Sequence, residues 1–294
     1  MTRDEGLRPF AGALLAVALF SLMDAALKGA ALALGAYSTL LLRAVLSASV
    51  TAPAFLSARK QWPSRAIMKV HLTRGAVATL MALTWVWGVT RVPLAEDIAL
   101  SFVAPLIALY LAAAVLGEAV SRSAVGASLL ALVGVAVIAA GRVNGDHGSH
   151  GLLGLAAILT SSVLYAWNLV LQRQQALLAG PLEIAMFQNA ITALVLVGFA
   201  PWFAQVPGEP RTWCVVAAAA ALGLIASMLY AWAYARAEAQ ALIPLEYSAF
   251  LWASLFGWLF FAERVRPATL AGVALIVMAC LAAVPRKRTE ATAL

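Results

Sequence analysis

Long apolar stretches alternate with short polar breaks along the whole chain, and this pattern divides it into ten segments of helical length. A helix needs about 20 apolar residues to cross a bilayer. The breaks carry charges, proline or glycine, as in Pro207-Gly208-Glu209-Pro210. The pattern predicts an all-α integral membrane protein with ten transmembrane helices, at residues 10–30, 36–57, 69–90, 94–117, 122–141, 151–172, 182–203, 212–235, 241–262 and 267–284.

Composition strengthens this prediction. Hydrophobic residues make up 64% of the 294 positions and charged residues 11%, whereas a soluble domain is about 45–50% apolar and about 25% charged. So few charges cannot cover the surface of a soluble fold of this size, which excludes a soluble enzyme, a disordered chain and a disulfide scaffold.

The net charge of +7 comes from basic residues scattered among the breaks, so we expect no nucleic-acid partner. With the N-terminus placed inside, twelve Lys and Arg residues fall on the inner side and six on the outer side. Cytoplasmic loops carry the excess of Lys and Arg in membrane proteins. Both termini are therefore predicted to be cytoplasmic.

An internal repeat appears when the chain is shifted by 145 residues against itself. Trp87 then meets Trp232, Arg91 meets Arg236, and Glu118 meets Glu263. A five-helix unit has an odd number of crossings, so its second copy must enter the membrane from the opposite side. We expect two inverted repeats, residues 1–142 and 151–288, followed by a cytoplasmic tail at 289–294. Inverted repeats are typical of secondary transporters with a substrate site near the midplane.

Signatures of enzymes and metal sites are missing from the sequence. It contains no nucleotide-binding GxxxxGK[ST] motif and no HExxH motif. The three histidines, His71, His147 and His150, have no expected partner at membrane depth, and the two cysteines form no ligand set. We therefore expect no enzyme activity, no cofactor and no metal.

Ionisable residues inside predicted spans are costly in hydrocarbon and are candidates for function. Asp24 and Arg43 both fall roughly 10 Å below the outer surface, which fits a structural ion pair or a gate. Lys28, one turn from Asp24, is an alternative partner. Arg74 and Glu246 form a similar pair by depth on the inner side, each about 8 Å from the cytoplasmic face.

The predicted helix 151–172 carries a polar stripe of Ser161, Tyr165, Asn168 and Gln172, with Trp167 alongside. Such a stripe should face protein or a water-filled cavity, and interhelical hydrogen bonding is the simpler alternative. Glu118 and Glu263 end their helices near the interfaces, where solvated carboxylates are expected.

The repeat also pairs Ser101 and Phe102 with Glu246 and Tyr247, at positions where the two halves can meet, while Trp252 falls close to the midplane. Trp85 and Trp87, like their repeat mates, are interpreted as interfacial anchors. Gly126, Gly134 and Gly272 indicate close helix packing.

In its motifs the chain resembles the drug/metabolite transporter superfamily, specifically its EamA-type ten-helix members. The resemblance rests on weak motifs whose order and duplication are specific, and it covers both halves. Phe250 stands where the second copy would carry the counterpart of Pro105, so a kink there need not be symmetrical. The motifs are Phe20-Ser-Leu-Met-Asp24 through Lys28, Leu42-Arg43, Leu72-Thr-Arg74-Gly75, and Pro93-Leu-Ala…Pro105…Leu116-Gly-Glu118 with its repeat Pro244-Leu-Glu-Tyr…Trp252…Phe261-Ala-Glu263.

This resemblance implies a carrier of small metabolites in the bacterial inner membrane, working by alternating access and most similar to YddG-type amino-acid exporters. A carrier of nucleosides, vitamins or drugs is the alternative, ahead of a membrane enzyme or scaffold. The small molecule and the lipid bilayer are the expected partners, and the oligomeric state stays open. The expected substrate-binding residues are Ser101, Phe102, Tyr165, Trp167, Asn168, Glu246, Tyr247 and Trp252, and the expected gating or structural ion pairs involve Asp24, Lys28, Arg43 and Arg74.

Overall fold

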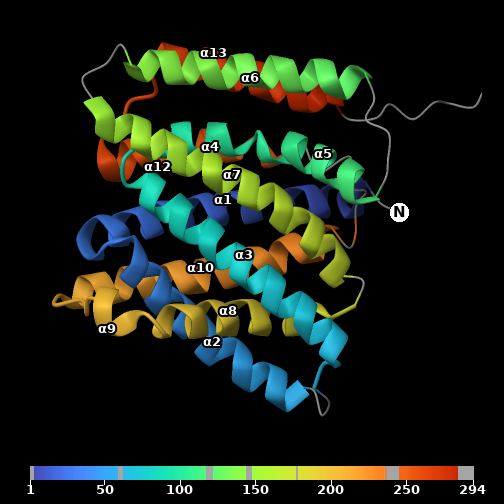
Figure 1. The fold of residues 1–294 in the computed structure, drawn as a ribbon, viewed down its shortest axis with the longest axis vertical. Coiled ribbons are helices and arrows are strands. Elements are labelled where there is room, and N and C mark those ends of the chain that lie inside the picture. Colours follow the sequence, from blue (N-terminus) through green and yellow to red (C-terminus); the bar gives the residue numbers. More distant parts are fainter. Residues whose placement is uncertain are drawn as a thin grey trace, which may run out of the picture.

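The structure, a computed structural model, describes residues 3–58, 62–116, 122–143, 148–176, 178–234, 236 and 245–283. Within these ranges the regular elements are all helices, and they pack side by side in one bundle (Figure 1). The helices are α1 (Arg3–Leu34), α2 (Ala36–Ala58), α3 (Arg65–Val89), α4 (Leu94–Ser101), α5 (Ala104–Leu116), α6 (Arg122–Val143), α7 (Gly148–Ala176), α8 (Pro181–Val197), α9 (Ala200–Phe203), α10 (Pro210–Tyr234), α12 (Ala249–Phe261) and α13 (Pro267–Ala283).

These helices confirm the all-α membrane architecture that the apolar pattern predicts. Five of them, α1, α2, α3, α7 and α10, are long and apolar enough to cross a membrane on their own. The predicted helices 94–117 and 182–203 are each divided into two pieces. The second division follows Gly198 and precedes Pro201, two residues that disfavour a continuous helix.

Packing between the helices is nearly unchanged when the two halves are exchanged. In chain order α1 corresponds to α7, α2 to α8, α3 to α10, and α6 to α13. Helix α1 packs on α10 as α7 packs on α3, and α10 packs on α2 as α3 packs on α8. Helices α2 and α8 pack on each other, and so do α6 and α13. Each half therefore completes its core only with helices from the other half.

The division between α4 and α5 recurs at the start of α12 with the same backbone bonds. Val103 N–H donates to Leu100 O, and Leu106 N–H donates to Val103 O. Exactly 145 positions later, Ser248 N–H donates to Leu245 O, and Leu251 N–H donates to Ser248 O. The break is thus symmetrical although only the first copy carries Pro105, which removes the reason to expect a difference at Phe250. At both places, hydrogen bonds between residues three apart, as in a 3₁₀-helix, interrupt the α-helical pattern of bonds between residues four apart.

The repeated Trp and Arg residues also have matching roles. The Arg91 guanidinium lies 3.4 Å from the Trp87 ring centroid and donates to the Trp87 carbonyl at 2.7 Å. Arg236 stands 4.7 Å from the Trp232 ring and donates to the Trp232 carbonyl at 3.1 Å. A cation that bonds the final carbonyls stabilises a helix C-terminus. The repeat therefore preserves a helix-ending device at α3 and α10.

Helices α6 and α13 approach closely through two glycines, Gly134 and Gly272, for which the sequence predicted close packing. A Cβ on Gly134 would stand 2.7 Å from the Gly272 carbonyl oxygen, and a Cβ on Gly272 would stand 2.6 Å from the Gly134 oxygen. Gly126 meets nothing within 4 Å, so its assignment to close packing is wrong. Of these three glycines, Gly134 and Gly272 have a steric reason to be glycine.

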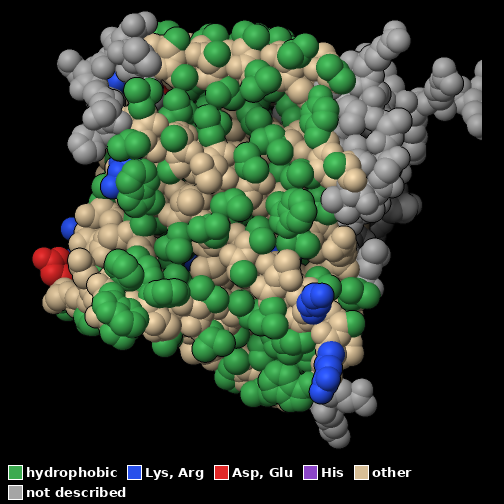
Figure 2. Space-filling view, in the orientation of Figure 1, with side chains coloured by type: hydrophobic (Ala, Val, Ile, Leu, Met, Phe, Trp, Pro, Cys, Tyr) green, Lys and Arg blue, Asp and Glu red, His purple; other side chains and the backbone are tan. Residues whose placement is uncertain are grey.

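The face of the molecule in Figure 2 is mainly hydrophobic, and its visible Lys and Arg side chains sit mostly toward the two ends of the bundle. Helix α1 begins and α13 finishes at the same end (Figure 1). We call this end the terminal end and the other the distal end. An apolar belt between charged ends is the surface that a membrane-spanning bundle requires.

Candidate functional site

Tyr165 of α7 marks the interior of the molecule. Its side chain lies deep among protein atoms, within electrostatic range of Asp24 from α1 and Glu246 from the segment before α12. Tyr165 is nevertheless 37% exposed, whereas its helix neighbours Ser161 and Asn168 are 3% and 4% exposed. An accessible side chain surrounded by protein has open space beside it. We infer that an open chamber lies beside Tyr165, between helices of both halves.

Asp24 and Arg43 bring opposite charges to this interior. Each acts electrostatically on the other, in agreement with the pairing by depth. Both side chains keep part of their surface accessible, and Arg43 Nε is buried without a hydrogen-bond acceptor among the described residues. A Cβ on Gly223 of α10 would come 2.7 Å from Met23 Sδ, so glycine leaves room for the Met23 side chain, and Arg43 Nη1 lies nearby at 3.9 Å.

Glu246 joins the same region through a tyrosine of α10. Tyr230 Oη donates to Glu246 Oε1, and the Tyr230 ring meets Phe20 of α1 edge to face, with centroids 6.0 Å apart. Helices α1, α7 and α10 thus converge with the segment before α12 around carboxylates, phenols and aromatic edges. Glu246 and Tyr165 are among the binding residues predicted from the sequence, whereas Tyr230 is not.

Two repeat-related aromatics meet where the halves touch. The rings of Phe102 and Tyr247 pack edge to face, with centroids 5.2 Å apart and planes at 87°. Ser101 donates within its own helix to the Asp97 carbonyl at 3.0 Å, and Trp252 stacks on Phe256 at 6.0 Å. The contact between Phe102 and Tyr247 agrees with the expectation that these positions lie at the junction of the two copies.

The structure does not bring Trp167 to this group. Trp167 is 39% exposed and shares a helical face with Val163 and Ala156, which are also exposed. Tyr165 stands two residues away, which is about 200° around an α-helix. The polar stripe itself divides: Ser161 bonds the Met81 carbonyl at 3.0 Å and Asn168 bonds Arg74, while Tyr165 stays open. Interhelical hydrogen bonding therefore accounts for Ser161 and Asn168, and the cavity interpretation stays a prediction for Tyr165.

An ion pair closes the distal end between the two halves. Lys28 of α1 pairs with Glu263, which follows α12, and donates to the Val92 carbonyl at 2.6 Å. Glu263 Oε2 accepts the Leu94 N–H at 2.8 Å. The Lys28 and Glu263 side chains are 4% and 17% exposed. The expectation of a solvated carboxylate at Glu263 is wrong, because this side chain completes a buried cluster that we call the distal closure. Its repeat mate Glu118 is outside the described residues.

A different polar network lies toward the terminal end, where α3, α7 and α8 meet. Arg74 donates from Nε to Asn168 Oδ1 at 3.1 Å and from Nη1 to Gln175 Oε1. The Gln175 amide donates to His71 Nδ1, and His71 Nε2 stands 3.1 Å from Glu183 Oε1. Depth along the helices had suggested Glu246 as the partner of Arg74. The structure directs Arg74 to two amide oxygens instead. We call this group the terminal network.

His71 corrects the expectation that no histidine has a partner at membrane depth. It is 1% exposed, is bonded at both ring nitrogens and stacks on Phe187 with centroids 4.5 Å apart. The amide donor at Nδ1 leaves Nε2 as the donor to Glu183, an order that fits a neutral imidazole. His147 lies outside the described residues.

Two acidic residues of α4 were missed by the sequence analysis. Glu96 is 1% exposed and accepts from Thr269 of α13 at 3.1 Å. Asp97 is 0% exposed and lies within electrostatic range of Asp24, Lys28 and Glu263. Both fall near the start of the predicted span 94–117, so an inventory of every ionisable residue inside the spans would have found them.

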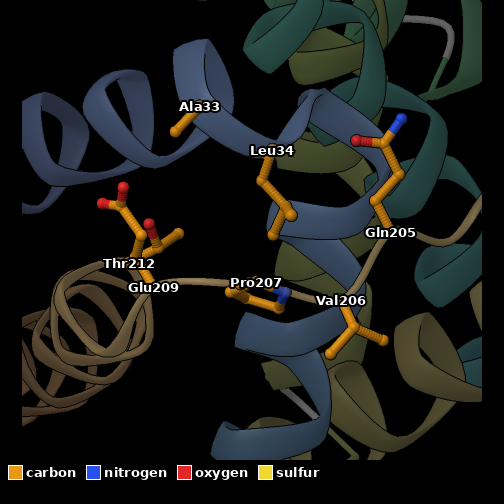
Figure 3. Close-up of a pocket in the computed structure, with 8 residues that line it drawn as sticks. Ala33, Leu34, Gln205, Val206, Pro207, Glu209 and Thr212 are labelled. Atoms are coloured by element: carbon orange, nitrogen blue, oxygen red, sulfur yellow. The ribbon is translucent and has the colours of Figure 1, made fainter.

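Two pockets have linings that include none of Tyr165, Asp24 and Glu246. One, of about 310 Å³, is formed where α1 ends, against residues 205–209 and the start of α10 (Figure 3). The other, of about 250 Å³, lies between α2, α3 and α7 beside Tyr37 and Trp87. Neither is lined by a predicted substrate-binding residue. Within the described residues there is also no group of three or more His, Cys, Asp or Glu side chains that could hold a metal ion.

Comparison with known proteins agrees with a transport role. The family model described as "EamA-like transporter family" matches residues 9–140 and again residues 152–284. Pseudopaline exporter CntI from Pseudomonas aeruginosa, in strains UCBPP-PA14 and PAO1, is 26% identical over 272 residues, covering 92% of this chain and 93% of the exporter. A solved structure described only as a crystal structure of a protein has a TM-score of 0.60, with 21% identity and 97% of both chains covered. That last likeness concerns the fold alone.

Proposed function

Because the chain belongs to the EamA-like transporter family, we propose that it is a secondary transporter that exports an amino acid or a related small zwitterion by alternating access. The relatives named pseudopaline exporters support export as the direction. The bacterial cytoplasmic membrane is the proposed location, with the terminal end facing the cytoplasm because most Lys and Arg residues fall on that side.

The accessible Tyr165 side chain inside the molecule is the observation that carries the proposal. Around it stand carboxylates and a guanidinium, so the chamber presents both signs of charge. Arg43 keeps part of its surface accessible and supplies a positive charge for a substrate carboxylate. Glu246 and Asp24 supply acceptors for a substrate ammonium group. Charge-assisted bonds of this kind favour a small molecule that carries both charges.

Aromatic side chains shape the rest of the proposed chamber. Phe20 and Tyr230 contribute one edge-to-face pair, and Phe102 and Tyr247 contribute another. Such rings supply rigid apolar contact while the phenol hydroxyls provide hydrogen bonds. These rings also favour the second candidate substrate class, flat ring compounds such as nucleosides, which therefore belong in the same assay.

The distal closure supports the alternating-access part of the proposal. It joins α1 and the connection between α3 and α4 to the segment after α12, so one buried ion pair holds both halves together at one end. Opening toward the outside requires this contact to separate. Transporters with inverted repeats open alternately on the two sides of a central site.

Counterflow into liposomes containing the purified protein tests the function. Liposomes are loaded with one unlabelled compound at a time, and entry of the same labelled compound is followed for the twenty amino acids and a set of nucleosides. We expect at least one amino acid to accumulate transiently. Accumulation of nucleosides alone favours the second class, and absence of counterflow for every compound contradicts the proposal.

A matched pair of variants on α7 tests the site. Tyr165→Phe removes a hydroxyl from the chamber, and we expect the rate of counterflow to fall by about tenfold, equivalent to about 1.4 kcal/mol. Trp167→Phe changes an aromatic residue on the outer face of the same helix, and its rate should stay within about twofold of wild type, less than about 0.5 kcal/mol. A larger effect at Trp167 than at Tyr165 contradicts this placement of the chamber.

A further inference from the structure

The carboxylate of Asp97 has an environment that the proposed substrate site does not explain. The side chain is 0% exposed, and neither oxygen makes a hydrogen bond of ordinary geometry with any described residue. Trp85 is near enough to offer a side-chain donor. An ionised carboxylate buried without partners is very costly, and the neutral acid is much less so. The conformation seen here therefore suits Asp97 as a carboxylic acid.

Charge balance around Asp97 leads to the same result. Asp24 lies within electrostatic range of the oppositely charged Arg43, and Glu263 forms an ion pair with Lys28. The three carboxylates of this region thus face two cations, and Asp97 is the one in excess. A proton supplies the missing positive charge with no further ligand. A metal ion needs several oxygen or nitrogen ligands, and the described residues contain no such acidic or histidine group.

Among the described residues, four helices pack against α4. Helix α12, its main neighbour, carries no titratable side chain within Ala249–Phe261 and is followed by Glu263. Helix α3 contributes Trp85, helix α13 contributes Thr269 to the neighbouring Glu96, and helix α7 contributes Tyr165, which is directed to Asp24 and Glu246. The charged groups that face Asp97 are Asp24, Lys28 and Glu263.

We propose that Asp97 is the proton-binding site of a proton-coupled exchanger and that its protonation controls the distal closure. With the proton bound, Lys28 holds Glu263 and the distal end stays shut. When the proton leaves for the cytoplasm, the new charge on Asp97 competes with Glu263 for the Lys28 ammonium and weakens the closure. After substrate leaves on the distal side, an external proton returns to an Asp97 carboxylate oxygen and the closure forms again. One proton enters for each substrate exported.

This inference rests on the proposed export function, and a readout without substrate keeps the two separable. Infrared difference spectra of the full-length protein in liposomes are recorded while the pH is raised. We expect the C=O stretching band of a protonated carboxylic acid to disappear in wild type and to be missing from Asp97→Asn at low pH. The band should persist in Glu96→Gln, the matched control at the next position. An unchanged band in Asp97→Asn overturns the inference, whatever the transport assay shows.

Transport provides the second readout, with the compound that gives the strongest counterflow. For one-to-one exchange, a pH difference of one unit supports about tenfold accumulation against a gradient. Wild type and Glu96→Gln should approach this ratio, whereas Asp97→Asn should exchange substrate without accumulating it. Equal accumulation by Asp97→Asn overturns the coupling role. Absence of counterflow in wild type contradicts the export function, and the infrared result still decides the proton site.

Discussion

The two ends of the molecule hold the halves together by different chemistry. At the distal closure, Lys28 and Glu263 form an ion pair supported by two backbone groups. In the terminal network, Arg74 bonds two amide side chains, and His71 contacts both Gln175 and Glu183. One end depends on a single charged pair and the other on a series of side chains.

This difference gives the two ends different responses to a change in charge. Asp97 lies within electrostatic range of Lys28 and can compete with Glu263 for its ammonium group, so a single proton can alter the balance there. In the terminal network, Gln175 fixes the order of donors and acceptors between Arg74 and His71, and the loss of one contact leaves others in place. We conclude that the distal end is the more switchable of the two.

The largest effect is expected when the closure loses its carboxylate. Glu263→Gln removes the carboxylate that pairs with the buried Lys28 ammonium, and we expect the free energy of unfolding to fall by about 3 kcal/mol. Thermal unfolding of the purified protein measures the change. Glu209→Gln, at an exposed position of the same end, should change stability by less than about 0.5 kcal/mol. Equal effects of the two substitutions would show that the closure contributes nothing.

A smaller effect is expected when the terminal network loses its guanidinium. Arg74→Met keeps much of the side-chain volume but leaves the oxygens of Asn168 and Gln175 without this donor, at a cost of about 2 kcal/mol. The same unfolding measurement applies, with the exposed Lys69→Met of α3 as control. A loss larger than that of Glu263→Gln would reverse the order of the two ends.

The smallest effect is expected from repeating the Glu-to-Gln change in the terminal network. Glu183→Gln retains an oxygen that accepts from His71 Nε2, so we expect a loss of less than about 1 kcal/mol. The comparison with Glu263→Gln is direct, because both substitutions remove one charge and preserve shape. Should Glu183→Gln be the more damaging, His71 is positively charged in the folded protein and the network is ionic after all.

The sequence predicted local features well because they depend on short-range patterns. Apolar stretches located the helices, and the shift of 145 residues found the matched Trp–Arg pairs that end α3 and α10. Depth along each helix brought Asp24 to Arg43.

Contacts between distant segments were beyond those patterns. Lys28 and Glu263 are separated by 235 positions. The sequence offered Lys28 as an alternative partner of Asp24, one helical turn away, and depth assigned Arg74 to Glu246. Trp167 was grouped with Tyr165 by proximity in sequence, although a step of two residues reverses the direction of a helical side chain. Glu183 received no attention because its partner His71 comes from another helix.

The paired interruptions at Val103 and Ser248 have a mechanical consequence. A straight helix behaves as a rigid rod, so any tilt at one membrane surface is carried to the other. A joint near the middle of the rod uncouples the two surfaces. With one such joint in each copy, the helix segments on one side of the membrane can tilt while those on the other side keep their positions.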